Sequence, residues 1–226
     1  MKVDFCLGEN LHLEVFMFDL LYYDADLAVC IKPAGMLSEG ESEGCMPYLL
    51  SSALREKGIV ATPFVVHRLD KETSGIMVFA LNSKTAALLS LASQNKDMKK
   101  IYHALCVGVM EKDGDILEDL LFYDRKRGKS FIVDRERKGV KDASLEYKVL
   151  ERFADRTLLE IELHTGRTHQ IRAQFSSRSH SLCGDRRYGA PAEFGNKLCL
   201  CAVRLSFTHP RTKERLSFEI KADFEK

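Results

Sequence analysis

Apolar residues follow two different spacings along the chain, and each spacing predicts a different element. Apolar positions three and four apart predict helices over 46–57 and 83–93, the second largely buried and with Ser83 as its N-cap. Residues 11–19 are apolar with interspersed charge and fit a strand less regularly. Runs rich in β-branched and aromatic residues predict strands over 20–23, 27–31, 64–66, 76–80, 101–109, 116–122, 130–134, 143–150 and 157–163.

This succession of many strands, two or three helices and short turns predicts an α+β fold, with a mostly antiparallel central sheet flanked by helices and loops. The chain has no internal repeat, low-complexity tract or long linker, so we expect a single domain over residues 1–226. No run approaches the roughly 20 apolar residues of a membrane span, and no signal-peptide core follows Met1. We therefore expect a cytoplasmic protein with no membrane partner.

The cysteines argue against a metal site. Seven of them are scattered without a CxxC pair, and the closest two, Cys199 and Cys201, would share one face of a strand. An odd, scattered count without a signal peptide favours reduced thiols over disulfides or zinc. The sequence also lacks a phosphate-binding loop and clustered metal ligands, so we predict no metal and no cofactor.

Charge is balanced over the whole chain but not locally. The 34 basic and 33 acidic residues give a net charge near zero, whereas a nucleic-acid binder usually has a basic surplus. Any contact with a nucleic acid must therefore come from a local patch, and the alternative is an ordinary solvated face of mixed charge. The candidate clusters are 124–129, 135–138, and the arginines Arg167, Arg172, Arg178, Arg186 and Arg187.

Charged side chains are densest between the predicted strands 64–66 and 76–80. Within six positions the chain places His67, Arg68, Asp70, Lys71 and Glu72. A loop held at both ends by buried strands is a rigid mount for a reactive side chain. The alternative is a polar hairpin tip that only reverses the chain.

A second polar segment, Gly166–Phe175, is expected to be helical. Its spacing would put Thr168, Ile171, Arg172 and Phe175 on one face. An arginine beside two apolar side chains must either extend to water or meet a buried anion. The residues alone leave both outcomes open.

The sequence motifs resemble those of the RluA-type pseudouridine synthases. The signature His67-Arg68-Leu69-Asp70-x-x-Thr73-Ser74-Gly75 is similar to the catalytic motif of that family. Further similar motifs follow the family's order within residues 20–210, at 21–35, 100–104, 165–172 and 184–189. The chain departs from the pattern in two places, since Gln174 stands where relatives often have histidine and Ser179-His180-Ser181 replaces the usual Gly-His-Pro.

The resemblance implies a role for each residue of a catalytic core. Asp70 would be the catalytic aspartate, acting on the sugar or on the uracil ring. Arg172 would pair with it, keeping the carboxylate ionised and oriented. Tyr102 would stack on the uracil and help remove the C5 proton, and Ile171 would pack against the target base. Arg68 would brace the gap that a flipped nucleotide leaves.

Other motif residues are expected to support this core. We interpret His67 and His169 as hydrogen-bonding scaffold rather than general bases. Arg167 is expected to contact phosphate or backbone, and Lys32 is expected to be part of the framework. Target choice is assigned to loops such as 111–142, which the sequence does not decode.

The resemblance implies an RNA pseudouridine synthase that isomerises uridine in ribosomal or transfer RNA, without a cofactor and as a monomer. Relatives often carry an S4 RNA-binding domain in front, and with only about 19 residues before the first motif this chain is expected to have none. Two alternatives stay open. One is a non-catalytic RNA-binding or ribosome assembly factor that retains the fold. The other is a nucleoside or glycoside hydrolase that uses Asp70 and Glu72 as a carboxylate pair.

Overall fold

The computed structural model describes residues 18–95 and 97–225. The strand expected over 11–19 lies outside this range apart from its last two residues, which are not in a strand. The helices are α1 (Met46–Glu56), α2 (Ser83–Gln94) and α3 (Gln170–Ser176), with short 3-10 helices at Arg186–Tyr188 and Ala192–Phe194. The strands are β1 (Leu20–Tyr23), β2 (Leu27–Lys32), β3 (Phe64–Val65), β4 (Ser74–Ala80), β5 (Lys99–Val107), β6 (Gly114–Asp124), β7 (Lys129–Val133), β8 (Val140–Arg152), β9 (Arg156–Leu163), β10 (Leu200–Thr208) and β11 (Arg215–Glu219).

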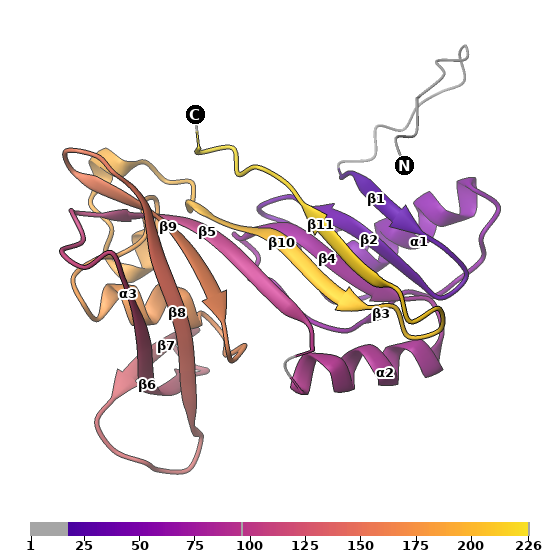
Figure 1. Ribbon diagram of the computed structural model, residues 1–226, viewed down its shortest axis with the longest axis horizontal. Helices are drawn as coiled ribbons and strands as arrows, with labels where there is room; N and C mark the ends of the chain where they lie inside the picture. The colour runs from indigo at the N-terminus through magenta and orange to yellow at the C-terminus, as the bar shows by residue number, and fades with distance from the viewer. Residues whose placement is uncertain (1–17, 96, 226) are drawn as a thin grey trace.

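These strands belong to one sheet with the order β1-β2-β4-β10-β5-β9-β8-β6-β7, in which β3 pairs with β4 and β11 with β10. All pairings are antiparallel except the short contact between β4 and β10. The sheet follows the long axis of the molecule, with β1, β2 and α1 at one end and β6, β7 and β8 at the other (Figure 1). The α+β prediction with a mostly antiparallel sheet is confirmed.

The glycine of the signature motif has a structural task in this sheet. Gly75 pairs with Ala202 where β4 and β10 meet, and its φ is +127°. A Cβ atom at this position would lie 2.4 Å from the backbone N and O of Ala202. Only glycine allows this approach. The contact brings the loop before β4 toward Tyr102, because β5 is the other neighbour of β10.

The main core packs α1 and α3 against the sheet. Leu69, next to the candidate aspartate, is 6% exposed and belongs to this core, so the loop that carries Asp70 is anchored by apolar burial. Other buried members include Met46, Leu50, Leu54, Met77, Phe79, Ile161, Ile171 and Phe175.

Helix α2 corrects two predictions. Its N-cap is Asn82, not Ser83, since the Asn82 side chain accepts a hydrogen bond from the backbone N–H of Thr85 at 2.9 Å. The same side chain donates to Asp26 at 3.1 Å, which fixes the turn one residue earlier. The helix is also not largely buried. In the described part of the chain its buried residues are Thr85 and Leu89, which lie one turn apart on the side that packs against β3 and β4.

Residues 111–142, described above as loops, form an arm made mostly of strands, as the strands expected over 116–122 and 130–134 already indicated. β6 pairs with both β7 and β8, and the basic clusters lie at the turns of this arm.

Within the described residues no helix is long and apolar enough to span a membrane. The cysteines that the structure describes are free thiols, as predicted.

Candidate active site

Asp70 lies on a loop that is hydrogen-bonded on both sides. The Ser38 hydroxyl donates to the carbonyl of Leu69 at 2.6 Å and accepts from the Leu69 N–H at 3.0 Å. The N–H of Thr73 then donates to the carbonyl of Asp70 at 3.0 Å, closing a turn. These bonds leave little freedom to the backbone of Asp70.

Lys32 is hydrogen-bonded to the backbone of the same loop. Its side chain is 0% exposed, and its ammonium donates to the carbonyls of Pro33, Met36 and Lys71 at 2.9, 2.8 and 3.0 Å. Burial lowers its pKa to about 8, against the opposing charges of Asp70 and Glu72. All three donors of Lys32 are therefore used on the backbone, in agreement with the framework role expected of it.

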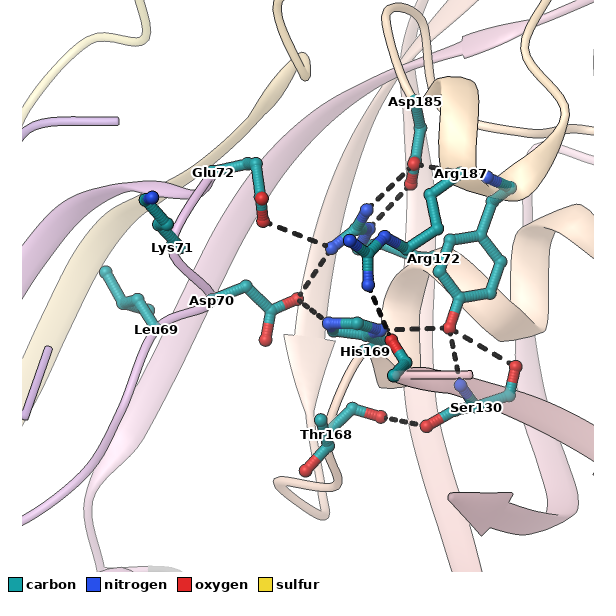
Figure 2. Close-up of polar contacts among 12 residues, drawn as sticks. Leu69, Asp70, Lys71, Glu72, Ser130, Thr168, His169, Arg172, Asp185 and Arg187 are labelled. Atoms are coloured by element: carbon teal, nitrogen blue, oxygen red, sulfur yellow. Dashed lines mark hydrogen bonds and ion pairs between the residues drawn. The ribbon is translucent and has the colours of Figure 1, made fainter. Parts of the chain in front are cut away.

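Arg172 joins three carboxylates at the centre of the site (Figure 2). Its Nη1 lies 3.3 Å from Asp70 Oδ2 and 3.6 Å from Glu72 Oε2. Its Nε and Nη2 donate to the two oxygens of Asp185 at 2.6 and 2.8 Å. The expected contact between Asp70 and Arg172 is present, but the strong bidentate partner of Arg172 is Asp185.

Burial and charge together fix the ionisation of this arginine. Arg172 is 3% and Asp185 2% exposed. Burial acts to lower the pKa of Arg172, but the hydrogen bonds and charge of Asp185 outweigh it, and the pKa is raised above its ordinary value. A permanent cation therefore faces Asp70, whose side chain is 21% exposed to the cleft.

Asp185 and Tyr188 contact Arg172 in the site, and the sequence analysis gave them no role. Their motif at 184–189 was recognised, but nothing in its spacing connects it to Arg172. The Tyr188 hydroxyl accepts from the backbone N–H of Ser130 at 2.8 Å and lies 3.1 Å from His169 Nδ1. The Arg172 guanidinium also stacks over the Tyr188 ring at 5.0 Å.

The helix expected over 166–175 begins only at Gln170. His169 takes a left-handed conformation with a φ of 54°, which no helix continues. The Gln170 side chain then accepts from the N–H of Arg167 at 3.0 Å and from the Thr165 hydroxyl at 2.7 Å, which stabilises the preceding turn. Thr168 is therefore not on the helix face proposed for it.

His169 lies between the aspartate and Tyr188. Its Nε2 is 3.9 Å from Asp70 Oδ2 (Figure 2). Burial lowers its pKa, opposed by the charge of Asp70. A neutral imidazole at this distance adds no positive charge next to Asp70 and can only help to hold the surrounding side chains in place. This supports the scaffold interpretation of His169.

His67 is also held as scaffold. Its Nε2 accepts the backbone N–H of Val78 at 3.2 Å, so a neutral ring carries its proton on Nδ1. Burial, helped by the charge of Lys100, lowers its pKa to about 3. In the described part of the chain the buried Nδ1 has no hydrogen-bond partner.

The lowered pKa of His67 predicts a pH effect on stability. Between about pH 6.5 and pH 3 the unfolded chain binds a proton at this histidine that the folded chain does not bind, so stability falls as the pH drops through this window. In His67→Gln the amide oxygen can still accept from Val78 and does not titrate. We expect the free energy of unfolding of the wild type to fall relative to the variant by up to about 3 kcal/mol between pH 6.5 and 4. Urea unfolding at several pH values measures this, and parallel curves would contradict it.

The site opens into a cleft of about 1100 Å³. Tyr102 and Ile171 line it and are 5% and 4% exposed. Burial, then the charge of Asp70, raises the pKa of Tyr102 well above its ordinary value, so the phenol stays protonated at neutral pH. This does not favour the resting Tyr102 as the base that removes a proton, and it leaves its ring as the contact surface.

Two predicted RNA-binding arginines lie at the rim of the cleft. Arg68 pairs with Glu39 at 2.6 Å, with both side chains more than half exposed. Arg167 donates through Nε to the carbonyl of Asp142 at 2.9 Å. Both line the cleft without contacting Asp70.

A group of potential metal ligands lies elsewhere, at the β1–β2 turn. Asp24, Asp26 and His209 bring ligand atoms within 4.8 Å of one another. Their oxygens already accept from protein donors, including His209 Nε2 at 2.8 Å and the guanidinium of Arg211. The group therefore acts as a polar junction between two turns.

Comparison with known proteins agrees with this geometry. Residues 26–177 match the RNA pseudouridylate synthase family. An RNA pseudouridine synthase of Aquifex aeolicus, described as uncharacterized, is 38% identical over 90% of this chain and 69% of its own length. The ribosomal large subunit pseudouridine synthase D of Neisseria meningitidis serogroup A is 35% identical over 91% of this chain, which spans 58% of that protein.

Two solved human structures share the fold. RNA pseudouridylate synthase domain containing 4 superimposes with a TM-score of 0.72 at 24% identity, covering 90% of this chain and 88% of its own. RNA pseudouridylate synthase domain containing 1 gives a TM-score of 0.76 at 20% identity, covering 95% and 87%. The family match and the sequence relatives define the class as an RNA pseudouridine synthase, an isomerase that acts on RNA. Within this class, the chain belongs to the RluA-type RNA pseudouridylate synthase family.

Proposed function

We propose that Asp70 is the catalytic residue of this synthase, that Arg172 orients it, and that large-subunit ribosomal RNA is the substrate. The observation that carries the assignment is the 3.3 Å contact between Arg172 and Asp70, at the mouth of a cleft also lined by Tyr102 and Ile171. The choice of RNA rests on the ribosomal relatives, such as that of Neisseria meningitidis. We further propose that the protein acts as a monomer in the cytoplasm.

The reaction breaks the N1–C1′ bond of a uridine, rotates the uracil and forms a bond from C5 to C1′. N1 gains a proton and C5 loses one, so the sum of atoms does not change. Asp70 would act on the sugar or on the ring, as a nucleophile or as a base. The cation of Arg172 holds the carboxylate ionised in one orientation, which is the preorganisation that such a step needs.

A base inside a helix cannot reach this cleft, so the target nucleotide has to be extruded at a cost of a few kcal/mol. The flipped uracil would lie between Tyr102 and Ile171. Arg68, exposed at the rim, would brace the gap, while Arg167 would contact the backbone of the RNA. His67 and His169 would hold the loop and the aspartate in place without exchanging protons.

Pseudouridine mapping tests the proposal. We expect a deletion strain to lose pseudouridine at one or a few positions of large-subunit ribosomal RNA, and the wild-type gene but not Asp70→Asn to restore it. If pseudouridine is lost only at positions of transfer RNA, the substrate is transfer RNA instead. No lost position in either RNA would contradict the proposed substrate.

A further inference from the structure

Lys100 is a lysine of the cleft that the catalytic mechanism does not use. It lies on β5 two residues before Tyr102, and alternate residues of a strand share one face. It lines the cleft together with Ser93 and His67. Its ammonium donates to the Ser93 hydroxyl, at the end of α2, at 2.8 Å.

The charge of Lys100 is not balanced within the described residues. Its one hydrogen-bond partner there is a neutral hydroxyl, although an ammonium has three donors. The neighbouring Lys99 is different, because its ammonium is paired with Glu162 at 2.6 Å. A half-buried cation with a single neutral partner costs free energy that an anion in the cleft would recover.

His67 adjoins Lys100 in the same part of the cleft. It is close enough to Lys100 for the ammonium to lower the pKa of the imidazole. Its Nδ1 carries the proton, since Nε2 accepts from Val78, and the described residues offer Nδ1 no acceptor. The Nδ1 atom is buried and does not face the cleft, so Lys100 is the donor of this pair that an anion in the cleft would meet.

We propose that Lys100, held by Ser93 and flanked by His67, binds a backbone phosphate of the RNA strand that carries the target uridine. This inference rests on the proposed function, in which Tyr102 contacts the uracil. Two residues of strand span about 7 Å, which puts Lys100 beside the base and not on it. The sugar–phosphate backbone adjoining the flipped nucleotide passes there, and a full positive charge favours a phosphate over a neutral uracil carbonyl.

Salt-dependent RNA binding tests this site. The probe is a transcript of the large-subunit ribosomal RNA of the source organism, with affinity measured by filter binding between 50 and 400 mM salt. Lys100→Gln removes the charge, and Lys100→Arg retains it. Lys84→Gln is the matched control, because Lys84 is exposed on α2 and does not line the cleft.

We expect Lys100→Gln to bind the RNA about five- to tenfold more weakly at low salt. The negative slope of log K against log salt should become less steep by about 0.7 to 0.9, as for one lost phosphate contact. Lys100→Arg and Lys84→Gln should keep the wild-type slope. An unchanged slope in Lys100→Gln, or an equal decrease in Lys84→Gln, overturns the site.

A measurement on the wild type covers the case in which Lys100→Gln does not fold. Acetylation of Lys100 by a soluble acylating reagent should fall at least about threefold when the RNA is present well above its Kd, whereas that of Lys84 should not. Equal reactivity of Lys100 with and without bound RNA overturns the site. Pseudouridine formation is scored in parallel: an RNA that is isomerised with no Lys100 effect defeats this inference alone, and an RNA bound through Lys100 but never isomerised defeats the proposed function alone.

Discussion

Replacing Asp70 by Asn is expected to lower the rate of isomerisation by at least about 10³-fold while RNA affinity stays within about threefold of the wild type. The amide has the shape of the carboxylate and can still accept from Arg172, 3.3 Å away, so the loop should remain in place. The amide, however, lacks the negative charge of the carboxylate that is proposed to react. Release of tritium from RNA labelled at C5 of uridine measures the rate, and filter binding measures the affinity.

Glu72→Gln is the control for this variant. Glu72 faces the same guanidinium, at 3.6 Å, but its side chain is 48% exposed. We expect a rate within about tenfold of the wild type. Near-wild-type turnover of Asp70→Asn would disprove its assignment. Comparable losses in both variants, with free uracil as a product, would instead favour the carboxylate-pair hydrolysis considered from the sequence.

Asp185→Asn is expected to produce the largest loss of stability, about 3 to 5 kcal/mol in the free energy of unfolding. Asp185 is 2% exposed and accepts two hydrogen bonds from Arg172, which is 3% exposed. The substitution leaves a buried guanidinium without its main counter-charge, so its contact with Asp70 should loosen too. Thermal and urea unfolding measure the stability, with a decrease in Tm of roughly 10 °C for a domain of this size.

Glu39→Gln is the matched control, because it breaks an ion pair of similar length on the surface. Glu39 and Arg68 are 2.6 Å apart, with side chains 55% and 58% exposed. Solvent screens such a pair, and we expect a change below about 1 kcal/mol. Equal effects of Glu39→Gln and Asp185→Asn would show that the buried pair does not hold the site together.

Local patterns in the sequence were sufficient for most of the secondary structure. Runs rich in β-branched and aromatic residues located β1 to β9 to within a few residues, whereas β10 and β11 were not predicted. The errors in the predicted helix starts lie where a contact with a distant part of the chain sets the first residue of the helix. The cap of α2 is Asn82, whose side chain donates to Asp26, and α3 begins at Gln170, whose side chain donates to the carbonyl of Ser144 at 3.1 Å.

The sequence by itself determined the family and the candidate residues Asp70, Tyr102 and Arg172, because the motifs are short, contiguous and rich in chemically distinct side chains. Only the tertiary structure decided how they are held. The contact of Arg172 with Asp70, and that of Lys32 with the carbonyl of Lys71, depend on segments far apart in the chain meeting in space. β10 comes late in the chain but lies between β4 and β5 in the sheet. This strand order depends on side-chain packing and pairing across the whole sheet, which no local sequence pattern encodes.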